Sequence, residues 1–269
     1  MMVIFSPWAP GLRGWKRESF LVAAGGAISM VGFAGYFVAL GRAPVAATTF
    51  VYYTYPIIVL LLSAVVWRRP LRSWEAAVCV SVLIGVALAV GPIGVSASLM
   101  IVLAPAVAAP FGWAVYLLVL SGPAALMPTM PKVFAGACGG VAVLLPYATW
   151  STRGQLLPMN SNAVVAMGLL TLCMLAIPAV LVTWGAARPG ERATAMIGSF
   201  EFAVAVGVGW LLQGDQLSMV QMRGVSLVLA SALYSAGHRR SVESDEALLE
   251  HGATPVQRRK PGTRSSLPG

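Results

Sequence analysis

A single carboxylate lies in the middle of a long apolar stretch, and it is the residue of this chain best placed to do chemistry. Glu201 stands within the run from Ala193 to Leu212, which as a helix of about 20 residues would match the roughly 30 Å core of a bilayer. A low dielectric disfavours the charged carboxylate, so Glu201 could exchange a proton or hold a substrate ammonium. Gly198 shares its helical face and would leave room beside it. The alternative is a protonated side chain that only fixes helix packing.

A tract of hydroxyl-bearing side chains forms the second group. Thr48, Tyr52 and Tyr55 follow one another at spacings of four and three, so on a helix they share a face and could form one wall of a polar cavity. Pro56 comes next and predicts a kink, because it removes one backbone hydrogen bond. The alternative is that these tyrosines only pack, since tyrosine is common near membrane interfaces.

A third group is aromatic. Trp113 and Tyr116 lie on one face of a stretch that also holds Pro105 and Pro110, and two prolines in one span predict a bent helix around a cavity. Trp113 could stack on an organic cation or an aromatic substrate. Aromatic residues at helical spacing also pack in cores, which is the alternative here.

Enzymatic chemistry finds little support in the residues available. His238 and His251 stand at or beyond the last apolar stretch, and Asp215 and Asp245 fall in a turn and in the polar tail. An intramembrane protease would therefore have neither a histidine base nor a pair of aspartates. There is no glycine-rich phosphate loop and no spacing typical of metal ligands. We expect no enzyme, no cofactor and no metal site.

The composition sets the class of protein in which these groups would act. Of 269 residues, 58% are hydrophobic and only 10% are charged, and the mean hydropathy is +0.80, which leaves too little polar surface for a soluble globule. The sequence predicts an all-α integral membrane protein in a lipid bilayer. The net charge of +9 lies in short connectors and the tail rather than along a helix face, so no nucleic acid is expected as a partner.

Eight transmembrane helices are predicted, joined by short connectors. Residues 1–17 precede them as a cytoplasmic segment, and residues 238–269 are too polar to pack and predict a disordered cytoplasmic tail. The predicted spans are Phe20 to Leu40, Val45 to Trp67, Trp74 to Val90, Ser98 to Leu120, Val133 to Trp150, Asn162 to Ala186, Ala193 to Leu212 and Val220 to Ser235.

Positive charge sets the expected orientation. With the N-terminus inside, the outer segments hold only Arg42 and Arg153, with Arg223 near an outer helix end, and all other Lys and Arg residues are inside. The excess of inner positive charge predicts that both termini are cytoplasmic in the plasma (inner) membrane.

A weak internal repeat relates the two halves. Shifting the chain by 146 residues aligns a long span, a polar turn, a leucine and a shorter span in each half. The turns have opposite charge, basic in Arg68-Arg69-Pro70-Leu71-Arg72 and acidic in Gly214-Asp215-Gln216-Leu217-Ser218, as an inverted repeat requires. The few identical pairs include Arg42 and Arg188, Ala47 and Ala193, Thr48 and Thr194, Leu71 and Leu217, Val82 and Val228, and Leu83 and Leu229.

The chain resembles the EamA-type branch of the drug/metabolite transporter superfamily. The resemblance is carried by Ala193-Thr194-Ala195-Met196 leading to Glu201, and by Pro44-Val45-Ala46-Ala47-Thr48 leading to Pro56, each followed by the turn, the leucine and a shorter helix. The family commonly has an acid-proline pair here, and each half keeps one member of it. This resemblance implies a bundle of two inverted five-helix repeats that exports amino acids, metabolites or drugs.

Against that plan the chain supplies three helices of the first repeat and five of the second. We expect an incomplete first repeat over residues 18–92 and a second repeat over residues 96–237. The first two helices are missing, either because the start codon is placed too far downstream or because the carrier is shortened and needs a homodimer or a partner subunit to close its cavity.

Together these observations predict a transporter of small organic molecules. Alternating access between the repeats would move a metabolite, amino acid or drug outward, with Glu201 as a candidate for proton coupling. The alternative is a non-transporting membrane subunit that binds and stabilises a partner.

Overall fold

The computed structural model describes residues 15–68, 70–91, 96–151, 153, 161–186, 190–208, 211 and 218–252. All the regular secondary structure in those ranges is helical, so the all-α prediction is confirmed. The predicted features that lie outside the described residues include the first 14 residues of the N-terminal segment, residues 214–217 of the acidic turn and the last 17 residues of the tail.

Within the described residues, five segments are long and apolar enough to cross a membrane, and they make the chain a multi-pass membrane protein. Two of them are interrupted: α3 is followed by α4, and α6 is joined to α7 by the short 3-10 helix η2 at Pro105, where the two prolines predicted a bend. The five segments are α2 (Lys16–Leu40), α3 (Val45–Tyr52) with α4 (Tyr55–Val66), α5 (Ser73–Val90), α6 (Ala97–Leu103) with η2 (Ala104–Val107) and α7 (Ala108–Ser121), and α8 (Thr129–Ser151).

The count of eight spans is not confirmed, because the last three predicted spans are broken or partly polar. The sixth consists of α9 (Ser161–Thr171), the π-helical η3 (Leu172–Ala176) and α10 (Ile177–Ala186). A π-helical turn directly before Pro178 fits the missing N–H of that proline. The seventh is divided into α11 (Gly190–Gly198) and α12 (Phe200–Val208).

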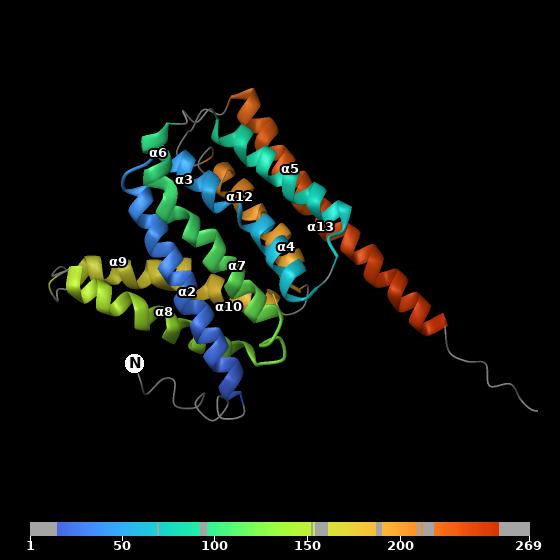
Figure 1. The fold of residues 1–269 in the computed structure, drawn as a ribbon, viewed down its shortest axis with the longest axis horizontal. Coiled ribbons are helices and arrows are strands. Elements are labelled where there is room, and N and C mark those ends of the chain that lie inside the picture. The colour runs from blue at the N-terminus through green and yellow to red at the C-terminus, as the bar shows by residue number, and fades with distance from the viewer. Residues whose placement is uncertain are drawn as a thin grey trace, which may run out of the picture.

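The last helix, α13 (Met219–Gly252), is much longer than predicted. It continues through residues 238–252, where the sequence predicts a disordered tail, and its C-terminal part runs on beyond the other helices (Figure 1). The prediction of disorder followed from the lack of apolar residues for packing. Helix formation also depends on intrinsic propensity, and the Glu-Ala-Leu-Leu-Glu segment at 246–250 consists of good helix formers.

Small residues let α2 pack closely against α7 and α8. A Cβ at Gly32 would collide with the backbone of Ala108, and one at Gly26 with the backbone of Gly136. Such contacts bring two helix backbones together and are typical of membrane bundles. The helix α2 therefore holds the first part of the chain against the middle of it (Figure 1).

The boundaries of the helices repeat at the interval found in the sequence. The helices α2, α3 and α5 begin at residues 16, 45 and 73, and α9, α11 and α13 begin at 161, 190 and 219, so each pair of starts differs by 145 or 146 residues. The break between α3 and α4, at residues 53–54, also lies 146 residues before the break between α11 and α12 at residue 199. The internal repeat is therefore visible in the helices themselves.

Equivalent helices of the two halves run in opposite directions. The helices α5 and α13 lie side by side (Figure 1), and a Cβ at Gly85 would lie 2.7 Å from the Cγ2 atom of Val228, whereas one at Gly224 would lie 2.9 Å from the Cβ atom of Leu88. Later residues of α5 thus meet earlier residues of α13. This antiparallel arrangement is what an inverted repeat produces.

Candidate functional site

Two interrupted helices face each other at the centre of the bundle. In the first, Tyr53 and Thr54 separate α3 from α4, and Pro56 has no N–H to offer to the carbonyl of Tyr52. The Thr54 hydroxyl donates instead to the Val51 carbonyl at 2.7 Å. In the second, Ser199 separates α11 from α12, and its hydroxyl donates to the Ala195 carbonyl at 3.3 Å. The kink expected at Pro56 is therefore present.

A tyrosine fastens the two interrupted helices together. The Tyr55 hydroxyl donates to the Ala195 carbonyl at 3.1 Å, and the side chain is only 2% exposed. Gly198 leaves space for it, because a Cβ at that position would lie 2.7 Å from the Tyr55 oxygen. Tyr55 and Gly198 thus form a packed joint between α4 and α11.

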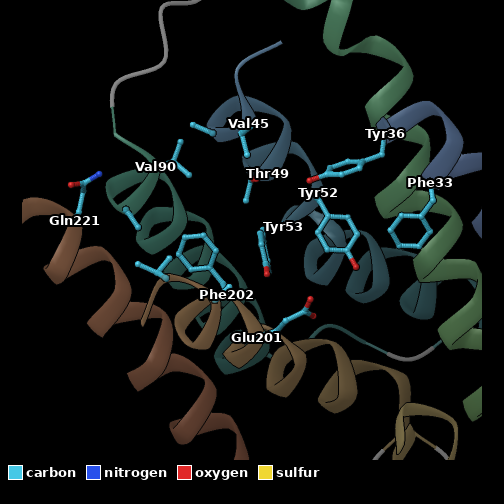
Figure 2. Close-up of a pocket in the computed structure, with 14 residues that line it drawn as sticks. Phe33, Tyr36, Val45, Thr49, Tyr52, Tyr53, Val90, Glu201, Phe202 and Gln221 are labelled. Carbon is cyan, nitrogen blue, oxygen red and sulfur yellow. The ribbon is translucent and has the colours of Figure 1, made fainter. Parts of the chain in front are cut away.

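A pocket of about 700 Å³ lies next to this joint, which is within the range of small-molecule sites. It reaches from the two helix breaks to residues at the ends of α3, α5 and α13 (Figure 2). The lining residues are Phe33, Tyr36, Val45, Ala46, Thr49, Tyr52, Tyr53, Ala89, Val90, Glu201, Phe202, Ala205, Val206 and Gln221.

Glu201 is on the wall of this pocket and not wedged between helices. Its carboxylate points into the space beside Tyr52 and Tyr53 (Figure 2). The residue lies in the first turn of α12, where the helix dipole stabilises negative charge. Within the part of the chain that the structure describes, no hydrogen bond or ion pair reaches the carboxylate. It is therefore free to meet a ligand.

Aromatic rings form a continuous row that ends at the pocket. Tyr52 is at its centre, with ring centroids 5.8 Å from Phe33, 5.8 Å from Tyr36 and 5.4 Å from Tyr53. Tyr53 in turn lies 4.9 Å from Phe202 on α12. These distances are typical of favourable aromatic pairs, so the rings hold one another in place around the cavity.

The structure brings together some of the predicted site residues and separates others. Tyr52 and Glu201 line the pocket, but Thr48 is buried and donates to the Pro44 carbonyl at 3.2 Å. Trp113 lies outside the lining, with its ring centroid 6.3 Å from that of Phe33. Tyr116 is further along the same row and contacts α2 at Gly25.

Residues outside the predicted set complete the pocket wall. Thr49 and Tyr53 are four residues apart on the neighbouring face of the same tract, and this spacing was a signal available in the sequence. Phe33, Tyr36 and Gln221 come from α2 and α13, and no local pattern marks them. Among the described residues, no three His, Cys, Asp or Glu side chains come together as a metal-binding group.

A buried ion pair lies at the opposite end of the interrupted helices. Arg192, near the start of α11, contacts Glu75, near the start of α5, at 2.8 Å, and their side chains are 12% and 9% exposed. The same guanidinium donates to the Ser63 hydroxyl on α4 and, at 3.3 Å, to the Pro70 carbonyl. One side chain of the second half therefore holds three points of the first.

Comparison with solved structures shows the fold. A crystal structure whose description reads only "Crystal structure of protein" is 20% identical to this chain, with a TM-score of 0.64, and the match covers 90% of this chain and 95% of that one. No curated protein sequence matches.

Comparison with family models bears on identity. The model of the EamA-like transporter family matches residues 1–91, which include α2, α3, α4 and α5. This segment holds the Pro44 to Pro56 stretch on which the resemblance rests. The predicted similarity to EamA-type transporters is therefore confirmed, and the match lies in residues 1–91.

Proposed function

We propose that this chain carries small organic molecules across a membrane by alternating access, with the pocket beside Glu201 as the substrate site. The observation that carries the proposal is the free Glu201 carboxylate on a cavity between two interrupted, antiparallel helices. Interrupted helices at a repeat interface are where secondary transporters bind their substrates. A carboxylate with no partner in an apolar bundle also favours a functional role.

The proposal assigns three helices to the first repeat and five helices to the second. Residues 18–92 and 96–237 are assigned to an incomplete and a complete inverted repeat, supported by the helix boundaries that recur after 146 residues. Transport is proposed to be outward across the plasma (inner) membrane, with both termini cytoplasmic as the Lys and Arg distribution indicates. Exchange of a proton at Glu201 is the proposed coupling step.

Reconstitution tests this function. Purified full-length protein in liposomes should exchange labelled metabolites, amino acids or drugs, and Glu201→Gln should abolish both the exchange and its dependence on a pH gradient. Glu18→Gln, a glutamate in the first turn of α2, is the matched control and should leave transport unchanged. Protein that moves no solute but co-purifies with a second membrane protein would contradict the proposal and favour a non-transporting subunit.

A further inference from the structure

We propose that the substrate of this pocket is an organic cation, with an ammonium group carried on a small apolar or aromatic body. The inference rests on the proposed function, because it names the substrate class of the same site. Three independent properties of the wall support it: its charge, its rings and the end of a helix.

The charge of the wall is the first property. Among the described residues that line the pocket, Glu201 is the acidic one, and none is Lys, Arg or His. A substrate carboxylate or phosphate would find no positive partner there and would be repelled by Glu201. An amino acid would satisfy its ammonium and leave its carboxylate unpaired. A cation without an acidic group is not repelled by Glu201 and leaves no carboxylate unpaired.

The rings are the second property. Five of the fourteen lining residues are aromatic, and they come from three elements: Phe33 and Tyr36 from α2, Tyr52 and Tyr53 from the α3 segment, and Phe202 from α12. Ring faces attract cations within about 6 Å of their centroids. Figure 2 shows the Glu201 carboxylate pointing toward the space beside the rings of Tyr52 and Tyr53. An ammonium placed beside Glu201 would therefore meet tyrosine rings as well.

The helix end is the third property. The helix α3 ends at Tyr52, on the pocket wall, and the C-terminus of a helix carries negative partial charge. Pro56 cannot donate to the Tyr52 carbonyl, so that oxygen keeps an open position. Carbonyl groups at such unwound points hold cations in other transporters. The acidic side chain, the aromatic rings and the end of the helix thus all favour a positively charged substrate.

A series of three probes with one aromatic ring and different charge tests the proposal. Benzyltrimethylammonium, phenylalanine and phenylacetate are titrated calorimetrically into the full-length protein in nanodiscs. The ammonium probe should bind at least about tenfold more tightly than the other two, a difference of the size that a desolvated cation–π contact gives. Glu201→Gln should remove that preference, Glu18→Gln should not, and Tyr53→Leu should weaken the ammonium probe several-fold where Phe20→Leu leaves it unchanged.

The outcomes separate the substrate class from the transport function. Tighter binding of phenylalanine or phenylacetate, or no binding of any probe, would overturn the cation proposal, and the series on the unaltered protein decides this even where a variant fails to fold. If liposomes exchange phenylalanine but not benzyltrimethylammonium, the transport function is supported and the cation proposal is contradicted. If the ammonium probe binds selectively but is not exchanged, the cation site is supported and the transport function is contradicted.

A second inference follows from the opposite end of the same helices. We infer that the Arg192–Glu75 ion pair closes the bundle at that end, and that it must separate when the pocket becomes accessible from there. The network joins α11 of one half to α4, α5 and the α4–α5 connection of the other. Glu75 also accepts from the Arg72 backbone N–H at 3.2 Å at the start of α5, so the pair is fixed to the end of a helix.

Among the described residues, the equivalent positions at the pocket end do not form an ion pair. Shifted by 146 residues, Arg192 corresponds to Ala46 and Glu75 corresponds to Gln221. Both of these uncharged residues line the pocket. The two ends of the inverted repeat are therefore equivalent in position but not in chemistry: one carries an ion pair at these positions, and the other carries two uncharged residues on the pocket wall.

Cysteine labelling tests this asymmetry. Thr49→Cys on the pocket wall is the reporter, in a chain with Cys79, Cys138 and Cys173 replaced by serine, and a membrane-impermeant maleimide is added to vesicles of each orientation. The reporter should react from one side only. Glu75→Gln should raise the rate from the other side at least about tenfold, because it leaves Arg192 without its charged partner.

Placing an arginine and a glutamate at the equivalent positions of the pocket end tests the converse. The double variant Ala46→Arg with Gln221→Glu should slow labelling from the pocket end, whereas Ala46→Arg alone and Gln221→Glu alone should do so less. Unchanged side preference in Glu75→Gln, or equal labelling from both sides in the parent, would overturn the inference. Ser63→Ala removes one hydrogen bond of the same network and replaces Glu75→Gln if that variant does not fold.

Discussion

The two interrupted helices follow one plan but use their equivalent residues differently. Tyr55 and Glu201 correspond under the 146-residue shift, and each lies at the start of the helix that follows a break. Tyr55 is buried and hydrogen-bonded to the Ala195 carbonyl. Glu201 has no partner among the described residues and lines the pocket. The first break therefore fastens the halves together, and the second presents a charge.

This division shows how a repeat can separate stability from ligand binding. Symmetry places two residues at equivalent points, but only one of them needs to face the cavity. The other can satisfy its polar group inside the protein, since a buried polar group is tolerated when it is hydrogen-bonded. Substitutions at the two positions should consequently affect different measurements, and the following predictions test this in order of expected size.

The largest effect is expected where the repeat halves cross. Gly224→Leu would force a side chain into the backbone of α5, because even a Cβ there would lie 2.5 Å from the Ala89 nitrogen and 2.5 Å from the Gly85 oxygen. Overpacking of this kind costs about 1–3 kcal/mol or more. We expect a marked fall in the unfolding midpoint in detergent. Gly168→Leu is the control, since nothing lies within 4 Å of a Cβ at that glycine; equal losses in both variants would contradict the close crossing.

A smaller loss is expected at the joint between the interrupted helices. Tyr55→Phe removes the hydroxyl that reaches the Ala195 carbonyl, and the loss of one such hydrogen bond costs about 1 kcal/mol. The unfolding midpoint should fall modestly while probe binding is kept, because Tyr55 does not line the pocket. Tyr147→Phe, at a residue that is 54% exposed, should change neither quantity. Loss of binding without loss of stability would reverse the assignment of Tyr55.

The repeat, the kink at Pro56 and the close packing of α2 were predictable because each depends on local chemistry. A proline lacks an N–H wherever it stands, and small residues at spacings of three and four, here Gly25, Ser29, Gly32 and Gly35, produce a flat helix face. These features need no knowledge of the neighbouring helices. The prediction of Glu201 as a site residue had the same basis, because an ionisable group in an apolar run is unusual in any fold.

The face of the tyrosine tract could not be predicted, because the break itself changes it. On an unbroken helix, Thr48, Tyr52 and Tyr55 would share one face. The helix instead stops at Tyr52, which lines the pocket together with Tyr53, and after the break Tyr55 points to α11. Phe33 and Gln221 join them only through tertiary packing.

The smallest effect on stability is expected at Glu201, and it completes the comparison with Tyr55. The side chain is exposed and unpartnered in the described structure, and substitutions at such positions usually change the free energy of unfolding by no more than about 0.5 kcal/mol. Glu201→Gln keeps the shape and removes the charge, so the unfolding midpoint should stay near that of the parent while binding of the ammonium probe is lost. The thermal unfolding curve and the titration are measured on the same preparation, with Glu18→Gln alongside. A large fall in stability would mean that Glu201, like Tyr55, holds the helices together, and the two breaks would then have the same role.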